Sequence, residues 1–305
     1  MNALDKIKEA KEFLESLGIE GADREAEIIV SHFLGIDRLI LYRDNPQIPE
    51  DIIPMIDELL TRRSKREPLQ YILGYTEFSG LKIEVGPGVL IPRPETELLA
   101  EQAIKTISNY KINPPLPPFN REKLGGLKIL DLCTGSGCLA LALAREFLGA
   151  QVYGTDTSEI AIKYANKNAK INKIKNVTFI EGSLFDPIKK LVAVHSAIGG
   201  SPFAFDLIVS NPPYIRGDDI KGLQAEIKDW EPVEALDGGE DGLDYYRIII
   251  PEARNYLEKT GFLMFELGIN QADAVKKMAE NTGFQNISLI KDYSGIERIL
   301  ILKKE

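Results

Sequence analysis

The 305-residue sequence is poor in the residues that build metal centres and disulfide scaffolds. It contains two histidines, His32 and His195, and two cysteines, Cys133 and Cys138, which flank a single glycine-containing stretch. Two cysteines so close together are too few for a disulfide framework or a zinc site, and we interpret them as small buried hydrophobic residues. Neither histidine lies near a predicted site. We therefore expect neither a bound metal nor a histidine general base.

Long apolar runs are also absent. No stretch approaches the roughly 20 apolar residues that span a bilayer, and residues 1–6 lack the basic and apolar regions of a signal peptide. We expect a cytoplasmic protein with no membrane partner. With 44% hydrophobic and 27% charged residues, the chain has enough apolar material for one large core and one smaller core.

Basic residues are in the minority. Lys and Arg total 37 against 46 Asp and Glu, which gives a net charge of −9. Proteins that follow phosphate backbones usually carry clustered Lys and Arg, so we expect no direct binding of nucleic acid. One basic cluster, residues 62–66, is interpreted as a solvated helix end that the helix dipole favours, with contact to an acidic partner or RNA as the alternative.

Apolar periodicity predicts a small helical domain at the N-terminus. Helices are expected over residues 3–17, from Asp23 to Gly35 and over about 50–66. Short apolar alternation with several glycines between Tyr71 and Leu90 then predicts a β-hairpin connector. The expected division is a substrate-recognition domain over 1–74, a connector over 75–95 and a catalytic domain over 96–305.

The second domain alternates predicted helices and strands, which indicates a doubly wound α/β sheet. A helix is expected over 96–110, a stiff proline-rich linker over 114–118 and an extended surface loop over 189–205. Strands are expected over 128–133, 151–156, 177–182, 205–210, 261–267, 286–290 and 296–302. The last two are joined by too few residues for a parallel crossover, so the final strand should run antiparallel.

The most informative stretch is Asn211, Pro212, Pro213 and Tyr214, directly after the strand predicted over 205–210. An amide or exocyclic amino nitrogen is a poor nucleophile because its lone pair is delocalised. The side-chain carbonyl of Asn211 and the backbone carbonyl of Pro212 can accept its two hydrogens, which favours a pyramidal nitrogen. The ring of Tyr214 can add a cation–π contact as positive charge develops. The alternative is an ordinary Pro-Pro turn that closes a strand.

A second pattern lies about 80 residues upstream. A buried strand ends at Cys133, and the residues that follow it form a tight loop before a helix: Thr134, Gly135, Ser136 and Gly137. The next predicted strand ends in Asp156, whose carboxylate is suited to a ribose diol. Because loops at the carboxyl ends of parallel strands share one edge of the sheet, Gly135, Asp156 and Asn211 should converge.

The glycine pattern also fits a dinucleotide-binding fingerprint, with Asp156 near the expected spacing. Asp131, ahead of the glycines, favours the cationic methionyl end of S-adenosylmethionine over the pyrophosphate of NAD. Asp131 has a plainer interpretation as a residue that caps the loop.

The sequence resembles the HemK family of protein-(glutamine-N5) methyltransferases. The match covers nearly the whole chain, and its most specific part is the run Arg93, Pro94, Glu95, Thr96 and Glu97. The other matching stretches are residues 68–74, 90–92, 131–137, 211–214 and 231–243.

This resemblance implies a Rossmann-like class I methyltransferase domain with seven strands, behind a helical N-terminal domain. It implies that S-adenosylmethionine methylates the Gln of the Gly-Gly-Gln loop in class I peptide chain release factors. By motif position, residues 133–137 line the methionyl part of the cofactor, Asp156 binds its ribose and Leu184 packs on its adenine. Asn211 to Tyr214 hold the substrate Gln, and Asn211 also borders the cofactor.

Two departures from the family pattern are visible: Cys133 stands where glycine is more frequent, and Leu184 lies near a position that some members give to Trp. For Arg93, Glu95 and Glu97 two interpretations stay open: a salt-bridged interdomain hinge and a direct substrate role. Three other interpretations stay open: an N6-adenine or N2-guanine nucleic-acid methyltransferase, a nicotinamide-dependent oxidoreductase and, most remote, a catalytically silent binding module on the same fold. The first normally needs an aromatic platform and a basic groove.

Overall fold

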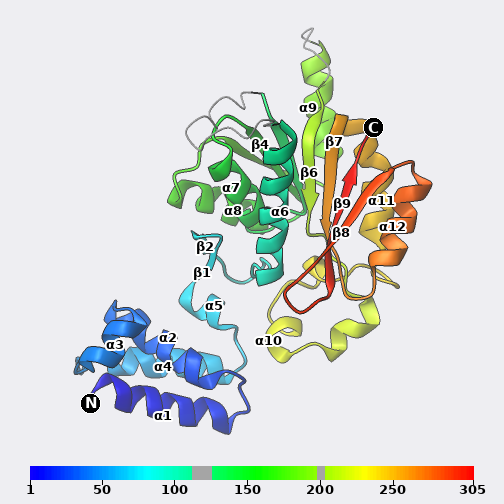
Figure 1. Ribbon diagram of the computed structural model, residues 1–305. Coiled ribbons are helices and arrows are strands. Elements are labelled where there is room, and N and C mark those ends of the chain that lie inside the picture. The colour runs from blue at the N-terminus through cyan, green and yellow to red at the C-terminus, as the bar shows by residue number, and fades with distance from the viewer. Residues whose placement is uncertain (112–125, 198–202) are drawn as a thin grey trace. The chain divides into compact units, whose positions relative to one another are not determined.

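The computed structural model describes residues 1–111, 126–197 and 203–305. The chain divides into two compact units, and the boundary between them falls at Tyr75 (Figure 1). The N-terminal unit also takes in Gln224–Trp230, a segment from far along the sequence. The proline-rich linker predicted over 114–118 lies outside the described residues. In the described part of the chain, no helix combines the length and the apolar character needed to cross a membrane.

The N-terminal unit is helical, as predicted. Its three longest helices are α1 (Ala3–Ser16), α2 (Ala22–Leu34) and α4 (Ile53–Ser64), and they confirm the three helices that the sequence predicted. Two short helices, α3 (Arg38–Asp44) and α5 (Leu69–Leu73), were not expected. The apolar stripes of the longer helices meet in one core, which includes Leu14, Ile29, Leu41 and Ile56, all fully buried.

The basic cluster at the end of α4 is neutralised within this unit. Arg63 is only 4% exposed, and its guanidinium contacts Glu25 at 2.6 Å and Glu226 at 3.0 Å. Arg62 pairs with Glu67. Glu226 belongs to α10 (Ala225–Lys228), so these ion pairs attach the segment 224–230 to the helices. The interpretation of the cluster as a solvated helix end is therefore wrong for Arg63.

The second unit is built on a seven-stranded sheet with the order β5-β4-β3-β6-β7-β9-β8. The strands are β3 (Lys128–Leu132), β4 (Gln151–Asp156), β5 (Val177–Glu181), β6 (Phe205–Ser210), β7 (Leu257–Glu266), β8 (Asn286–Lys291) and β9 (Glu297–Lys303). The final strand runs antiparallel to both of its neighbours, which confirms the prediction. The other neighbouring pairs are parallel, so the loops after β3, β4 and β6 share one edge.

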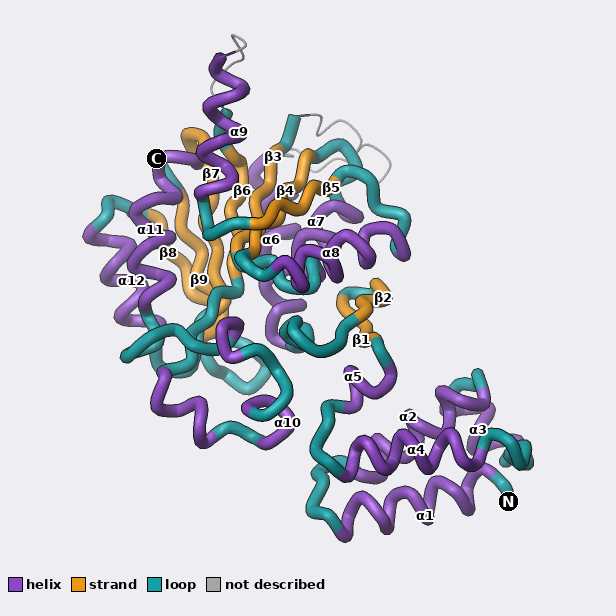
Figure 2. Tube along the Cα trace, turned by 180° about the vertical axis from the view of Figure 1, so that it is seen from behind, coloured by secondary structure: helices purple, strands orange, loops and turns teal. Residues whose placement is uncertain are grey.

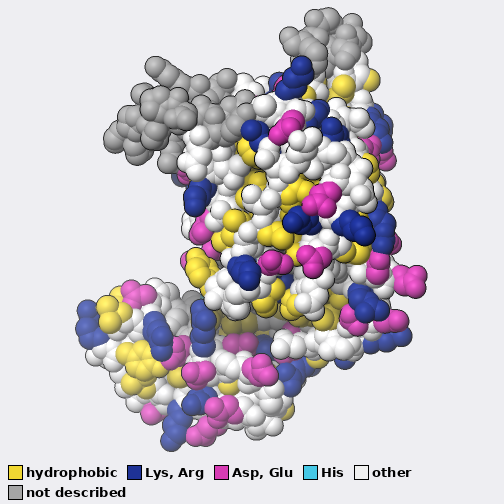
Figure 3. Space-filling model, turned by 45° about the vertical axis from the view of Figure 1, so that its right-hand side comes forward, with side chains coloured by type: hydrophobic (Ala, Val, Ile, Leu, Met, Phe, Trp, Pro, Cys, Tyr) yellow, Lys and Arg dark blue, Asp and Glu magenta, His cyan; other side chains and the backbone are white. Residues whose placement is uncertain are grey.

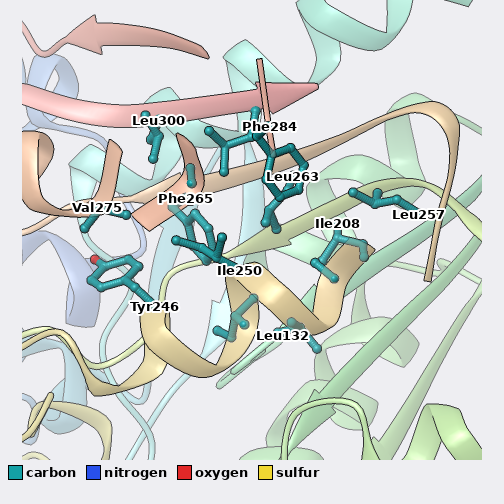
Figure 4. Packing of buried hydrophobic residues seen from close by; sticks show 14 of the residues in the cluster. Leu132, Ile208, Tyr246, Ile250, Leu257, Leu263, Phe265, Val275, Phe284 and Leu300 are labelled. Atoms are coloured by element: carbon teal, nitrogen blue, oxygen red, sulfur yellow. The ribbon is translucent and has the colours of Figure 1, made fainter. Parts of the chain in front are cut away.

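Helices cover both faces of this sheet (Figures 1 and 2). On one face α6 (Pro94–Lys111), α7 (Cys138–Glu146) and α8 (Glu159–Ile171) pack side by side. On the other face α9 (Asp186–Ala197), α11 (Asp244–Tyr256) and α12 (Ala272–Asn281) bury one apolar cluster against the strands. Figure 4 shows Tyr246 and Ile250 of α11 beside Phe265 of β7 in this cluster.

Helix α9 corrects the expectation of an extended loop over 189–205. Its apolar residues Ile188 and Val192 are four positions apart, so they lie on one face and pack on the large core. This stretch is therefore helical because its apolar face packs on the core, although its small residues had suggested a loop. The remainder of that predicted loop, 198–202, lies outside the described residues.

The predicted connector contains a short hairpin, β1 (Tyr75–Phe78) with β2 (Leu81–Glu84). Asn168 of α8 holds β2 in place: its amide oxygen accepts from the Glu84 N–H at 2.7 Å, and its amide nitrogen donates to the Glu84 carbonyl at 3.0 Å. The chain then runs past the edge of the sheet to α6, which begins with a proline, a residue suited to a first helical turn.

Candidate active site

A cavity of about 470 Å³ lies at the shared edge, where β3, β4 and β6 end. Its volume falls within the range of about 300–1,000 Å³ that is typical of small-molecule sites. Six residues predicted for the site border it: Cys133, Gly135, Asp156, Leu184, Asn211 and Pro213. The prediction that Gly135, Asp156 and Asn211 converge is thereby confirmed.

Residues 133–137, which we call the glycine loop, are shaped by two carboxylates. Asp131 is buried, and its Oδ2 accepts from the Thr134 hydroxyl at 2.6 Å and from the Ala140 N–H at 3.1 Å. Asp156 accepts from the Gly135 N–H at 2.9 Å. Asp131 thus holds the loop from inside and does not border the cavity, in agreement with its plainer interpretation.

Burial raises the pKa of Asp131 to about 7, although its two hydrogen bonds favour the charged form. Burial likewise raises the pKa of Asp156, against the effect of three backbone N–H donors. The Cys133 thiol has its pKa raised by burial and by these two carboxylates. Asp156 borders the cavity, where a carboxylate suits a ligand that offers hydroxyl donors or positive charge.

The rest of the glycine loop supports the cavity without bordering it. Thr134 and Ser136 are buried beneath it. A methyl group in place of the Gly137 hydrogen would lie 2.8 Å from the Phe179 ring and 2.9 Å from the Ala165 side chain, so the loop packs tightly on β5 and α8. Cys133 itself has a φ of 58°, a conformation that glycine adopts more readily.

Residues 211–214, which we call the acceptor loop, are held by glycines from a distant part of the chain. A Cβ at Gly238 would lie 2.8 Å from the Tyr214 Cα, and one at Gly242 would clash with the Tyr214 carbonyl oxygen. The same carbonyl accepts from the Gln271 side chain at 2.8 Å. Only glycine allows so close an approach. Residues 238–242 therefore act as a backbone clamp on the acceptor loop.

Side chains fix the acceptor loop from its other side. The Asn211 amide nitrogen lies 2.9 Å from the Thr96 hydroxyl oxygen, and this hydroxyl lies 2.6 Å from Oε2 of Glu266. The Tyr214 hydroxyl donates to Oε1 of the same carboxylate at 3.1 Å. Burial raises the pKa of Glu266 to about 6, partly offset by these hydrogen bonds. Burial and the Glu266 charge raise the pKa of Tyr214.

Two predicted residues of the acceptor loop, Pro212 and Tyr214, are not among the described residues that border the cavity. Pro212 is buried, and the Tyr214 hydroxyl faces Glu266. The cavity instead takes Asn211 and Pro213 from this loop.

Sequence reasoning missed one wall of the cavity. Gly88, Val89 and Leu90 border it, and so does Tyr245 of α11. The carboxylate of Glu231 anchors the chain beyond Leu90, since it accepts from the Ile91 N–H at 3.1 Å and from Arg93 at 2.6 Å. The runs 90–97 and 231–243 were noticed as motifs, but no periodicity or spacing showed that they meet.

The charged residues of the 93–97 run hold local structure. Arg93 pairs with Glu231, and Glu97 accepts from the Ser79 N–H at 2.7 Å in the turn of the hairpin. The described residues that border the cavity include neither of them, nor Glu95. Both contacts lie within the second unit, so they give Arg93 and Glu97 a local structural role, and the interdomain hinge stays a prediction. In this run it is Thr96 that reaches the acceptor loop.

Comparison with known proteins identifies both parts of the chain. A PrmC N-terminal domain model matches residues 5–74, and a methyltransferase domain model matches residues 123–295. The release factor glutamine methyltransferase of Thermodesulfovibrio yellowstonii is 45% identical over 100% of this chain and 99% of its own length. The protein of the same name from Geobacter sulfurreducens is 43% identical over 94% of this chain and 92% of its own.

Solved structures show the same fold. A T. thermophilus 16S rRNA methyltransferase, in complex with AdoMet and guanosine, superposes with a TM-score of 0.50 at 20% identity, over 76% of this chain and 50% of its own. At that identity the likeness shows the fold alone. The relatives that match over nearly their whole length, together with the methyltransferase domain model, show that the chain is a methyltransferase and belongs to the release factor glutamine methyltransferase family.

Proposed function

We propose that this protein transfers the methyl group of S-adenosylmethionine to the side-chain amide nitrogen, N5, of the Gln in the Gly-Gly-Gln loop of class I peptide chain release factors. The observation that carries the proposal is one cavity bordered by both the glycine loop and Asn211. The full-length relatives named for this activity support it.

The residues of the cavity fit the cofactor. Cys133 and Gly135 border the space for its methionyl part, and Thr134, Ser136 and Gly137 shape that loop from behind. Asp156 suits the ribose diol, and Leu184 offers an apolar surface to the adenine. The bound cofactor supplies an electrophilic methyl group on a sulfonium ion. The Asp156 carboxylate borders the cavity and favours that positive charge, while Asp131 holds the glycine loop behind it.

The acceptor loop orients the substrate amide. With the Asn211 amide nitrogen bonded to Thr96, the Asn211 carbonyl oxygen can accept one N–H of the Gln. The backbone carbonyl of Pro212, which lies between two residues that border the cavity, can accept the other. Both acceptors become more effective as positive charge grows on the nitrogen, so they stabilise the transition state more than the ground state. Pro213 closes this side of the cavity, and the Tyr214 ring stands behind it.

We assign substrate recognition to the N-terminal unit, residues 1–74, with 75–95 as connector and 96–305 as catalytic domain. A substrate that works on the ribosome places the reaction in the cytoplasm. Methylation of a nucleic-acid base is less well supported. In the view of Figure 3 basic and acidic side chains are interspersed, and Arg63, in the basic cluster, is paired with carboxylates.

The direct test incubates the protein with labelled S-adenosylmethionine and purified class I release factors, followed by peptide mass spectrometry. We expect one added methyl group on the Gln of the Gly-Gly-Gln loop. A release factor with Ala in place of that Gln is the control. Methyl transfer to the control, or to RNA or DNA in place of the release factor, would contradict the proposal.

A further inference from the structure

We propose that Thr96 and Glu266 are positioning residues that determine which end of the Asn211 amide faces the substrate. The inference rests on the proposed function, because it assigns a purpose to the orientation of Asn211. Thr96 lies 115 residues from Asn211 and 170 residues from Glu266 in sequence, so the folded chain brings together three groups that no short motif contains.

The two hydrogen bonds that link Glu266, Thr96 and Asn211 form a chain that we call the relay. Counting hydrogen-bond donors shows which group donates in each bond. An ionised carboxylate only accepts hydrogen bonds, whereas a hydroxyl has a single hydrogen to donate. The 2.6 Å contact between Thr96 and Glu266 therefore uses the hydroxyl hydrogen of Thr96. The Thr96 oxygen has only lone pairs left for Asn211, 2.9 Å away. Asn211 must then turn its NH2 group to Thr96 and its carbonyl oxygen away from it.

This orientation is the one that methyl transfer requires. If the Asn211 amide were flipped, its two N–H donors would face the amide hydrogens of the substrate. These donors would repel the substrate amide and could not stabilise the positive charge that develops on its nitrogen. An Asn side chain has no intrinsic preference between the two ends, because its oxygen and nitrogen are nearly equal in size. The relay supplies the preference.

Because the relay is buried, it can favour one orientation of the Asn211 amide over the other. Thr96 is 3% exposed and Glu266 is fully buried. Glu266 also accepts from the Tyr214 hydroxyl, so one carboxylate aligns the first and the last residue of the acceptor loop. A water molecule cannot readily replace either bond in so enclosed a place, and a buried donor or acceptor left without a partner is destabilising.

The charge of Glu266 depends on pH. The groups that face it are Glu95, Tyr214 and Arg298, and the hydroxyl of Tyr246 donates to its backbone carbonyl. Burial brings its pKa to about 6, so the carboxylate is ionised above that pH. Below it, a protonated Glu266 can donate to Thr96, whose hydrogen is then free to attract the Asn211 carbonyl oxygen. We therefore expect kcat to fall below about pH 6, because the Asn211 amide loses its orientation.

The decisive variant is Thr96→Val, which has nearly the same shape and no hydroxyl. We expect kcat for release-factor methylation to fall about 10- to 100-fold, the range for a lost positioning hydrogen bond. The KM for release factor and the affinity for S-adenosylmethionine should stay within about threefold, because the relay acts on orientation. Thr96→Ser restores the hydroxyl and should recover most of the rate. Thr106→Val, the same change elsewhere on α6, should be neutral.

The pH profile separates a relay from a packing role. Glu266→Gln has no ionisable group at this position, so its kcat should lack the acid limb near pH 6 that we expect of the wild-type enzyme. A Thr96→Val enzyme with normal kcat would overturn the inference. Equal impairment of Thr96→Val and Thr96→Ser would overturn it as well, because packing, rather than the hydroxyl, would then be responsible.

A measurement without turnover keeps this inference distinct from the proposed function. The side-chain amide resonances of Asn211, assigned with an Asn211→Ala sample, should titrate near pH 6 in the wild-type protein and move in Thr96→Val. If the wild-type protein methylates no release factor, the proposed function fails while these resonances still decide the orientation of Asn211. Resonances that neither titrate nor respond to Thr96→Val would overturn the relay.

Discussion

The two loops that meet at the cavity are held in different ways. The glycine loop is shaped by the two strands that flank it in sequence: Asp131 of β3 bonds to residues three and nine positions further on, and Asp156 at the end of β4 accepts from the Gly135 N–H. The acceptor loop is shaped from far away, by Thr96, by Gln271 and by the glycines at 238 and 242. The glycine loop thus depends mainly on its neighbours in the chain, whereas the acceptor loop depends on Thr96, 115 residues before Asn211, and on Gln271, 57 residues after Tyr214.

This difference assigns separate effects to the two loops. Damage to the acceptor loop should reduce the rate of methyl transfer and leave cofactor binding intact. Damage to the glycine loop or to its carboxylates should weaken cofactor binding first. The variants below test that separation.

Asn211→Ala should have the largest effect. It removes an acceptor that acts mainly in the transition state, for which losses of about 100- to 1,000-fold in kcat are typical. The affinity for S-adenosylmethionine, measured by isothermal titration calorimetry, should remain within a few fold. Near-normal turnover, or an equal loss in cofactor affinity, would remove the distinction between the loops.

Gly242→Ala tests the clamp behind the acceptor loop. The added methyl group would clash with the Tyr214 carbonyl oxygen, and the residue has a φ of 76°. Overpacking and backbone strain together should cost about 1–3 kcal/mol, seen as a lower midpoint in urea and a lower kcat. Gly222→Ala is the matched control, because a Cβ at that position would meet no atom within 4 Å beyond its own chain neighbours. Equal effects of the two changes would argue against a clamp.

Asp156→Ala probes the opposite side of the cavity. It removes the partner of the Gly135 N–H together with the expected ribose contact, so cofactor affinity should fall about 10- to 100-fold. At saturating cofactor, kcat should be affected far less. Asp186→Ala, at the exposed start of α9, provides a control in which a carboxylate is lost away from the cavity. Unchanged affinity would exclude Asp156 from the ribose site.

Asp131→Asn should have the smallest effect, visible in the pH dependence of stability. Burial raises the pKa of Asp131 from 3.8 to about 7, so between these values the folded protein holds a proton that the unfolded chain releases. The contribution of Asp131 to the free energy of unfolding therefore decreases as pH rises through this window. Urea titrations should show a shallower decrease for Asp131→Asn. If the free energy of unfolding changed equally with pH in the wild-type protein and in Asp131→Asn, Asp131 would not contribute to the pH dependence of stability.

The contrast between the loops also explains what could be predicted from sequence. Local sequence patterns predicted the parallel strands, the antiparallel final strand and the convergence of Gly135, Asp156 and Asn211. The same patterns failed where tertiary packing decides, as in α9, where Ile188 and Val192 find the core. The wall formed by residues 88–90 and the bond from Thr96 to Asn211 join parts of the chain that no period or spacing connects.

The central claim is that the Asn211 side-chain oxygen, not its nitrogen, meets the substrate amide. A crystal structure of the protein with S-adenosylhomocysteine and a peptide that contains the Gly-Gly-Gln loop tests it most directly. We predict the Gln side-chain nitrogen within hydrogen-bond distance of both the Asn211 carbonyl oxygen and the Pro212 carbonyl oxygen, with the Asn211 nitrogen still on Thr96. A Gln nitrogen bound elsewhere, or an Asn211 side chain turned away from Thr96, would contradict the account.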